Sequence, residues 1–311
     1  MKQVSISEFM DPDAVAKLDQ CVQLRYEPTW VDQRDVLLKS LASADALIVR
    51  NRTQVNTELL DAAPALKVVG RLGVGLDNID VKACEARGIR VIPATGANAR
   101  SVAEYVVTTA LMLMRGAYLS HAEMVAGKWP RARLSEGHEA FGRTLGLIGF
   151  GDIGRLTARL AAALGMQVVA HDPMLPADHP AWAENNVKPL ALDALLATAD
   201  AVSLHVPLVP ATRHLINTER IRGMKRGAVL INTARGGVID ETALATALKE
   251  GTLAGAALDV FENEPLGAGS VLADAPNLVL TPHIGGVSHE ANVRVSMMIA
   301  DAVRDALGVQ A

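Results

Sequence analysis

Cysteine and aromatic side chains are scarce in this 311-residue sequence. It contains two cysteines, Cys21 and Cys84, and only 3% of its residues are aromatic. Neither cysteine has the spacing of a C-x-x-C pair or a metal-ligand cluster, which excludes a disulfide framework and a zinc-type site. We therefore expect two buried thiols in a reducing compartment and no metal.

A membrane-spanning run, a secretion signal and an excess of positive charge are also missing. The longest helical apolar stretch, residues 102–114, is interrupted by Glu104 and is too short to span a bilayer. The N-terminus has no apolar signal region. The net charge of −4 gives no reason to expect nucleic acid or an anionic membrane as a partner. We therefore expect a soluble cytoplasmic protein.

What the sequence has is a regular alternation of short apolar runs and helical patterns. Before residue 97, strand-like runs at 4–7, 22–26, 46–49, 67–69 and 90–92 alternate with helical patterns at 12–18, 31–42, 57–63 and 81–87. After residue 143 the strand-like runs are 145–148, 167–170, 201–204, 228–232, 253–258 and 278–280, and a final helix is expected over 288–307. Such alternation is typical of parallel α/β sheets. We predict an α/β fold with two doubly wound parallel sheets.

A long helical pattern over residues 98–126 separates the two alternating regions. It is apolar on nearly all sides, so we expect it to be buried between domains or between subunits, and we expect a homodimer. We assign residues 1–96 plus 287–311 to a discontinuous substrate domain and residues 97–286 to a dinucleotide-binding domain. We expect the substrate in a cleft between them that closes about hinges near the two boundaries.

Three glycines in G-x-G-x-x-G spacing follow the apolar run at 145–148. Gly149, Gly151 and Gly154 open a helical pattern, which leads to a second apolar run and then to Asp172. This order indicates a dinucleotide-binding unit, because the glycines let the pyrophosphate approach and the helix N-terminus attracts it. The acid would accept hydrogen bonds from the ribose hydroxyls and repel a 2′-phosphate, which favours NAD over NADP. The alternative is an ordinary strand–turn–helix unit.

Chemically active side chains follow three further apolar runs. The segments are 232–237 (NTARGG), 258–265 (LDVFENEP) and 280–286 (LTPHIGG). They bring an arginine, several acids and a histidine to the carboxyl ends of strands, where doubly wound sheets bind ligands. Taken alone, each residue has a simpler explanation as a carbonyl-capping arginine, a surface glutamate or a strand-end histidine.

With these segments the chain resembles the D-isomer-specific 2-hydroxyacid dehydrogenase family, and it looks most like the 3-phosphoglycerate dehydrogenase and sulfolactate dehydrogenase branch. The resemblance extends over nearly the whole length and rests on VGRLGVGLDNID (69–80), SVAEYV (101–106), GFGDIG (149–154), NTARGGVIDE (232–241), AALDVFENEP (256–265) and TPHIGG (281–286). It implies two Rossmann-like domains and NAD as the cofactor. The regulatory C-terminal extension of many phosphoglycerate dehydrogenases is not expected, because the chain stops after the 288–307 helix.

The resemblance implies that Arg235, Glu264 and His283 form the catalytic set. A histidine titrates near neutral pH and can exchange the hydroxyl proton while a hydride moves to or from the nicotinamide. The glutamate would orient the ring and favour the imidazolium, and the arginine would bind the substrate carboxylate and polarise the carbonyl. The implied reaction is NAD-dependent oxidation of a 2-hydroxy acid at its CH–OH group, or the reverse.

The resemblance also implies which residues bind the two ligands. Those expected at the cofactor are Gly149, Gly151, Asp152, Ile153, Gly154, Asp172, Thr233, Ala234, Asp259 and Gly286. Those expected at the substrate are Arg50, Arg71, Val74, Gly75 and Arg235, with backbone N–H groups of the LGVG loop binding the carboxylate. For Asp259 the alternative is a strand-end residue that caps a turn.

Arginines at the ends of two N-terminal strands suit a substrate with a second anionic group. Arg50 and Arg71 occupy positions where phosphoglycerate dehydrogenases bind the distal phosphate, and Arg52 is a third candidate. The alternative is that these arginines pair with nearby acids. Segment 93–98 (PATGAN) lacks the asparagine that begins the corresponding run of phosphoglycerate dehydrogenases. Phosphate, sulfonate and carboxylate tails therefore all stay open.

Two other functions stay open as well. A hydroxypyruvate or glyoxylate reductase would reduce keto acids with uncharged tails at least as fast as those with anionic tails. An NAD-responsive co-repressor would use the same fold as a binding protein, although it would need a peptide-binding groove and disordered tails, and this sequence shows no such tails. The favoured partner is a small 2-hydroxy or 2-keto acid.

Overall fold

The computed structural model describes residues 1–309, and the chain divides into two compact units. Unit 1 consists of Met1–Asn98 together with Val287–Ala311, and unit 2 consists of Ala99–Gly286. The chain therefore leaves unit 1 after Asn98 and returns to it after Gly286. No helix among residues 1–309 combines the length and the apolar character needed to cross a membrane.

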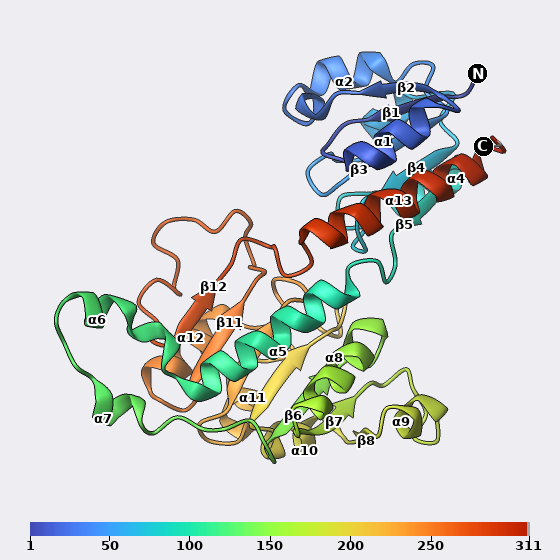
Figure 1. Ribbon diagram of the computed structural model, residues 1–311. Coiled ribbons are helices and arrows are strands. Elements are labelled where there is room, and N and C mark those ends of the chain that lie inside the picture. The colour runs from blue at the N-terminus through green and yellow to red at the C-terminus, as the bar shows by residue number, and fades with distance from the viewer. Residues whose placement is uncertain (310–311) are drawn as a thin grey trace. The chain divides into compact units, whose positions relative to one another are not determined.

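Unit 1 is a five-stranded parallel sheet with the order β2-β1-β3-β4-β5 (Figure 1). Its elements are β1 (Gln3–Ile6), α1 (Pro12–Asp19), β2 (Gln23–Tyr26), η1 (Pro28–Asp32), α2 (Arg34–Ser40), β3 (Ala46–Val49), α3 (Thr57–Asp61), β4 (Val68–Arg71), α4 (Val81–Ala86), β5 (Arg90–Pro93) and α13 (His289–Ala306). The C-terminal helix α13 packs on α1, β4 and β5. A Cβ on Gly70 of β4 would lie 2.8 Å from side-chain atoms of Ile299 and Val303, so the glycine permits this close packing.

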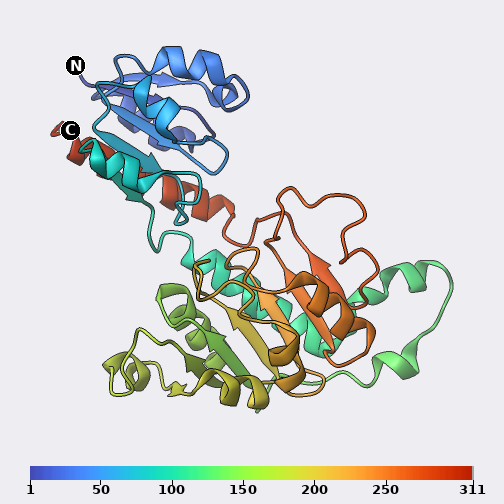
Figure 2. The same cartoon turned by 180° about the vertical axis from the view of Figure 1, so that it is seen from behind.

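Unit 2 is a seven-stranded parallel sheet with the order β12-β11-β10-β9-β6-β7-β8. Its elements are α5 (Ala99–Arg115), η2 (Tyr118–Ser120), α6 (His121–Val125), α7 (Arg131–Leu134), β6 (Thr144–Ile148), α8 (Asp152–Ala163), β7 (Gln167–His171), α9 (Pro180–Glu184), β8 (Lys188–Pro189), α10 (Leu192–Thr198), β9 (Ala201–Leu204), α11 (Thr218–Gly223), β10 (Val229–Asn232), α12 (Glu241–Lys249), β11 (Gly255–Leu258) and β12 (Leu278–Leu280). Helices cover both faces of the sheet, as the two opposite views show (Figures 1 and 2).

The strand order reverses in unit 2 between β6 and β9, which are hydrogen-bonded neighbours. From β6 the chain continues outward through β7 and β8, then returns to β9 and builds toward β12. A crevice forms at such a reversal, outside the carboxyl ends of the strands, and ligands bind there in doubly wound sheets. The loop with the three glycines begins at this point, directly after β6.

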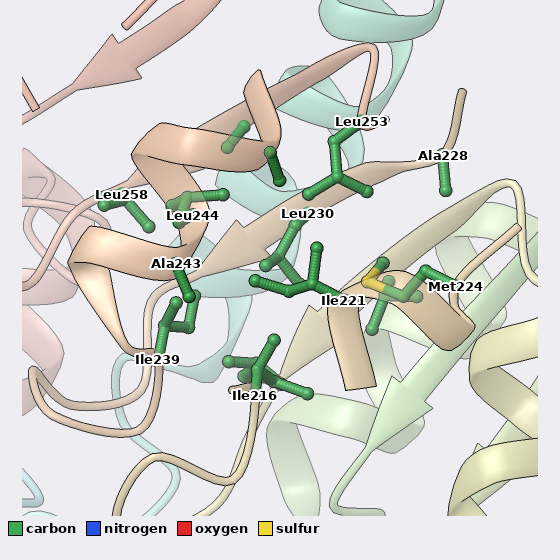
Figure 3. Close-up of a cluster of buried hydrophobic side chains, with 14 of the residues drawn as sticks. Ile216, Ile221, Met224, Ala228, Leu230, Ile239, Ala243, Leu244, Leu253 and Leu258 are labelled. Carbon is green, nitrogen blue, oxygen red and sulfur yellow. The ribbon is translucent and has the colours of Figure 1, made fainter. Parts of the chain in front are cut away.

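The core of unit 2 is aliphatic. One of its clusters joins helices α11 and α12 to strand β10, and Figure 3 shows Ile221, Leu244 and Leu230 pointing toward one another. The second cluster lies on the α5 and α8 side and includes a stacked pair of rings, Phe150 and Trp182, with centroids 4.7 Å apart. Burial of these side chains fixes the strands whose ends carry the polar residues.

The helix predicted over residues 98–126 is wrong in its length. The observed helix α5 ends at Arg115, and the next residue, Gly116, has φ of 67°. This left-handed conformation ends a helix, and glycine adopts it without steric cost. The apolar face of α5 packs on α8, β10 and β11 of its own unit. Its apolar character is therefore accounted for within unit 2 and gives no argument for a dimer.

Candidate active site

The polar segments singled out in unit 2 follow neighbouring strands at one edge of the sheet. The glycine turn follows β6, and Asp172 follows β7. The segments with the arginine, the acids and the histidine follow β10, β11 and β12 in that order. Because all seven strands are parallel, these loops lie at the same carboxyl edge.

Each glycine of the turn meets a different spatial demand. Gly149 has φ of 95°, and a Cβ there would collide with the carbonyl of His205. A Cβ on Gly154 would lie 2.5 Å from the carbonyl oxygen of Gly149, so this glycine lets α8 start directly under the turn. Gly151 faces open space, with nothing within 4 Å of an added Cβ. The turn is therefore tight on its protein side and open at Gly151.

Asp172 faces the glycine turn. Its Oδ2 accepts a hydrogen bond from the backbone N–H of Phe150 at 2.8 Å, and its Oδ1 accepts from the N–H of Met174 at 2.9 Å. The carboxylate thus lies against the residue between the first two glycines, as the predicted dinucleotide unit requires. Its remaining lone pairs are available for ribose hydroxyls.

Glu264 and His283 form a hydrogen-bonded pair. The distance from Oε2 of Glu264 to Nδ1 of His283 is 2.8 Å, and both side chains are more than one third exposed. The other carboxylate oxygen accepts from the N–H of Phe261 at 3.1 Å, which fixes the glutamate within its own loop. With Nδ1 engaged by Glu264, Nε2 is the ring nitrogen that a proton exchange would use.

The backbone of His283 is held in an unusual conformation. Its φ is 55°, a left-handed value that non-glycine residues adopt only where the surroundings fix it. Its N–H donates to the carbonyl oxygens of Asp259 (2.8 Å) and Thr281 (3.0 Å). The ring is therefore presented from a turn that β11 and β12 define together.

Asp259 organises the loop that carries the histidine. It is 1% exposed, and its Oδ1 accepts from the hydroxyl of Thr281 (2.6 Å) and the N–H of Ile284 (2.8 Å), while Oδ2 accepts from the N–H of Gly285 (2.7 Å). These contacts are those of the turn-capping alternative considered for Asp259. Thr281 in turn contacts the hydroxyl of Tyr105 on α5 at 2.7 Å. Burial raises the pKa of that tyrosine, the hydrogen bond with Thr281 lowers it, and the charge of Asp259 raises it further.

Arg235 follows β10 in a turn shaped by Asn232. This asparagine is 2% exposed, and its amide donates to the carbonyl of Arg235 (2.9 Å) and accepts from the N–H of Ala234 (3.0 Å). The guanidinium of Arg235 donates to the carbonyl of Ala234 at 2.6 Å. A Cβ on the next residue, Gly236, would collide with the carbonyl of Phe261. The arginine turn and the loop of the glutamate are therefore packed directly against each other.

Apart from Arg235, the predicted substrate residues lie at or beyond the carboxyl edge of the other sheet, in unit 1. Arg50 follows β3, and its Nη2 donates to Oδ1 of Asn292 on α13 at 2.8 Å. Arg71 ends β4, and its Nη1 donates to the carbonyl of Leu72 at 3.0 Å, beside the LGVG loop where Val74 is exposed. Arg52 forms an ion pair with Asp32, with both side chains mostly exposed. For Arg52 the alternative, pairing with a nearby acid, is therefore what the structure shows.

Comparison with known proteins places these observations in a family. A family model described as the NAD binding domain of D-isomer specific 2-hydroxyacid dehydrogenases matches residues 107–285. The chain belongs to the D-isomer specific 2-hydroxyacid dehydrogenase family. It is 57% identical over 311 residues to an (S)-sulfolactate dehydrogenase of Chromohalobacter salexigens, which covers all of both chains. It is 43% identical over 307 residues to a D-3-phosphoglycerate dehydrogenase of Mycobacterium bovis, covering 98% of this chain and 56% of that protein.

The fold agrees with that assignment. A crystal structure of a glyoxylate reductase from Paecilomyes thermophila superimposes with a TM-score of 0.85 at 31% identity, covering 98% of this chain and 95% of that one. The predicted α/β architecture of two parallel sheets is thus confirmed. The chain is an NAD-dependent 2-hydroxyacid dehydrogenase, an oxidoreductase that acts on the CH–OH group of donors.

The edge of unit 2 fits NAD at two places. No side chain of the described chain caps the N-terminus of α8, and Gly151 leaves the space before it open. The N–H groups there suit a pyrophosphate. The hydroxyl of Thr233, expected near the nicotinamide ribose, is buried and has no hydrogen-bond partner among residues 1–309. A buried hydroxyl without a partner is costly, and a ligand group beside it would satisfy it.

Sequence reasoning missed several residues of these edges. His205 follows β9, and burial lowers its pKa to about 4. Tyr105 and Asn232 lie inside motifs that carried the resemblance, but their hydrogen-bond partners could not be read from spacing. Glu8 follows β1 in the same way that Arg50 follows β3, and its place at a strand end was the signal that could have identified it.

Proposed function

We propose that this enzyme interconverts a D-configured 2-hydroxy acid that carries a second anionic group and the corresponding 2-keto acid. The observation that carries the proposal is the pair Glu264–His283, 2.8 Å apart, together with the packing of the glutamate's loop against the turn of Arg235. A proton-exchanging imidazole beside a carbonyl-binding guanidinium is what hydride exchange at a hydroxy acid needs. When bound, NAD supplies the hydride acceptor, or as NADH the donor.

The three side chains take complementary roles. Nε2 of His283 accepts the proton of the substrate hydroxyl during oxidation and returns it to the carbonyl oxygen during reduction. Glu264 orients the ring through Nδ1 and stabilises its charged form. The guanidinium of Arg235 binds the substrate carboxylate and the carbonyl oxygen, where negative charge develops.

The second anionic group of the substrate is inferred from Arg50. Its guanidinium contacts the neutral side chains of Asn292 and Phe9 and makes no ion pair within residues 1–309. Burial lowers the pKa of Arg50, and the charge of the nearby Glu8 carboxylate opposes this. Because no carboxylate of residues 1–309 is in salt-bridge contact with the guanidinium, it can bind an anionic ligand. The 57% identical relative acts on (S)-sulfolactate, and (S) denotes the D arrangement there because the sulfomethyl group outranks the carboxylate. A sulfonate tail is therefore the first candidate, ahead of phosphate.

A panel of keto acids tests the proposal. NADH consumption is measured with sulfopyruvate, phosphohydroxypyruvate, oxaloacetate, hydroxypyruvate and glyoxylate. One anionic-tail substrate should exceed the neutral ones about a hundredfold in kcat/KM, or about 2.7 kcal/mol of discrimination. Similar rates for all would instead indicate a general hydroxypyruvate or glyoxylate reductase, and NAD binding without turnover would indicate a binding protein.

His283→Ala tests the assignment of the proton-exchanging group. We expect kcat to fall about a thousandfold or more, in the range typical of lost general acid–base catalysis. Glu58→Gln serves as the control for a substitution alone, because Glu58 is 61% exposed and pairs with Arg34 at the surface of unit 1. Retention of more than a tenth of the activity in His283→Ala would remove His283 from the catalytic set.

We also infer a homodimer, from apolar side chains exposed between α5 and β6. Tyr118, Val125, Trp129 and Phe141 are each 69–79% exposed. Such a concentration of large apolar groups on one segment is unusual for a surface that faces only water. Light scattering should give twice the chain mass of 32.8 kDa, and Trp129→Asp should shift the mass toward one chain. A monomer mass for the unaltered protein would contradict the inference.

A further inference from the structure

Glu8 is a buried carboxylate at the carboxyl end of β1, and the mechanism above does not use it. It is 4% exposed. Its Oε1 accepts hydrogen bonds from the backbone N–H groups of Arg50 (2.8 Å) and Thr53 (3.0 Å), and Oε2 accepts from the N–H of Arg52 (3.1 Å). One side chain therefore binds three backbone donors of the loop that follows β3.

The same loop is fixed through its carbonyl groups. Asn78 is 7% exposed, and its amide donates to the carbonyl oxygens of Thr53 (2.7 Å) and Arg50 (3.3 Å). The hydroxyl of Ser7, next to Glu8, contacts the hydroxyl of Thr53 at 3.0 Å. Loop 50–53 is thus held on both its donor and its acceptor side by buried groups of the segments that follow β1 and β4.

This arrangement decides which groups are left to bind an anion. Successive backbone N–H groups at a strand end form a common anion-binding concavity. Here Glu8 accepts from the N–H groups of Arg50, Arg52 and Thr53 as an internal anion, so these three donors are not left for a ligand. Arg52 is paired with Asp32. The guanidinium of Arg50 contacts Asn292 and Phe9 and makes no ion pair with a carboxylate of residues 1–309, although the charge of Glu8 acts on it.

We propose that Glu8 is a positioning residue that orients Arg50 to bind the anionic tail of the substrate, and that it thereby determines how strongly the enzyme prefers charged to neutral tails. This inference rests on the proposed function. Glu8 does not touch the substrate; it fixes the backbone from which Arg50 projects, and Asn292 fixes the far end of the same side chain. The substrate class it favours is a three-carbon keto acid with a sulfonate, phosphate or carboxylate at C3.

Glu8→Gln tests the inference. The amide keeps the size of the side chain but turns an NH₂ group toward a backbone donor, which leaves that donor without an acceptor. With sulfopyruvate, KM should rise about tenfold or more, as expected when a charge-assisted contact is misplaced, while kcat changes less than about threefold. With hydroxypyruvate, kcat/KM should change less than about threefold, so the preference for the charged tail falls about tenfold.

Asn292→Ala is the second variant, in case Glu8→Gln does not fold. It removes the acceptor of the Arg50 guanidinium without changing the hydrogen bonds of the loop 50–53 backbone, and it should shift the same preference by about threefold or more. Glu58→Gln is the matched control, because it makes the same chemical change on a surface carboxylate of unit 1 and should leave the preference unaltered.

The possible outcomes distinguish a failure of the positioning role of Glu8 from a failure of the proposed function. Suppose that the unaltered enzyme prefers sulfopyruvate to hydroxypyruvate. If folded Glu8→Gln keeps the ratio of the two kcat/KM values within twofold, either with both values unchanged or with both lowered equally, the positioning role is overturned. If Glu8→Gln does not fold, an unchanged ratio in Asn292→Ala overturns it. If the unaltered enzyme shows no discrimination, the proposed substrate class and this inference both fail.

Discussion

The substitution Asp259→Asn tests how the loop with the candidate catalytic histidine is held in place. In the enzyme the carboxylate is 1% exposed and accepts from the hydroxyl of Thr281 and from the N–H groups of Ile284 and Gly285. An asparagine has one oxygen and one NH₂ group in place of the two oxygens. Whichever way the amide turns, at least one of the three donors faces another donor in a buried site.

The expected cost follows from these contacts. A buried donor without an acceptor costs about 1–3 kcal/mol, and the remaining bonds lose the strength that the carboxylate charge gives them, so the total is about 3 kcal/mol. For a unit of this size, that loss lowers the melting temperature by about 6–12 °C. Because the N–H of His283 donates to the carbonyl of Asp259, the ring is also misplaced. A misplacement of this kind lowers kcat/KM about a hundredfold.

The assay combines thermal unfolding with steady-state reduction of the best keto acid by NADH. Thr281→Val removes one of the three donors, so its melting temperature and its activity should lie between those of the unaltered enzyme and of Asp259→Asn. Thr281→Ser keeps the hydroxyl and should resemble the unaltered enzyme. Unchanged melting and unchanged kcat in folded Asp259→Asn would refute the reasoning. A rise confined to the KM for NADH, with no change in melting, would instead assign Asp259 to the cofactor.

Three further predictions concern single residues. Gly151→Ala should fold normally, since nothing lies within 4 Å of the added Cβ, but the KM for NAD should rise about tenfold because the methyl group enters the space of the pyrophosphate. Burial opposes ionisation of Asp45, but hydrogen bonds from a backbone N–H and two lysines hold its pKa at about 2. The pKa of this carboxyl in the unfolded chain is about 4, so its stabilising effect is present above pH 4 and is lost as the pH falls from about 4 to 2. Because the two lysines are exposed and solvent screens their charges, Asp45→Asn should lower the free energy of unfolding at pH 7 by only about 1–2 kcal/mol, measured by urea titration. A difference that does not change with pH would contradict this. Burial lowers the pKa of His205 to about 4, so the unfolded chain binds the proton more tightly and the free energy of unfolding falls as the pH drops from about 6.5 toward 4. At pH 5 the loss is about 2 kcal/mol relative to pH 7. In urea unfolding, His205→Gln should lose about 2 kcal/mol less than the unaltered enzyme between pH 7 and pH 5.

Much of the fold was determined by local sequence pattern. Every strand expected from an apolar run is present, with ends that differ by at most two residues, because a buried parallel strand must be a short apolar run bounded by polar or glycine residues. The glycine spacing likewise determined the tight turn before α8. The position of arginine, glutamate and histidine after three successive runs was enough to predict that they lie at one edge, because carboxyl ends of parallel strands share one edge.

Tertiary structure alone decided which groups contact one another. Tyr105 and Thr281 are 176 positions apart, and Glu8 and Arg50 are 42 apart, so no spacing rule relates them. Their contacts follow from strand order, which places β1 beside β3 and which periodicity does not encode. The same holds for Arg50 and Arg52, which are alike in sequence: one lies against neutral side chains and the other against Asp32. A sequence shows which chemical groups reach an edge, whereas the packing of the sheet decides which of their charges is left for a ligand.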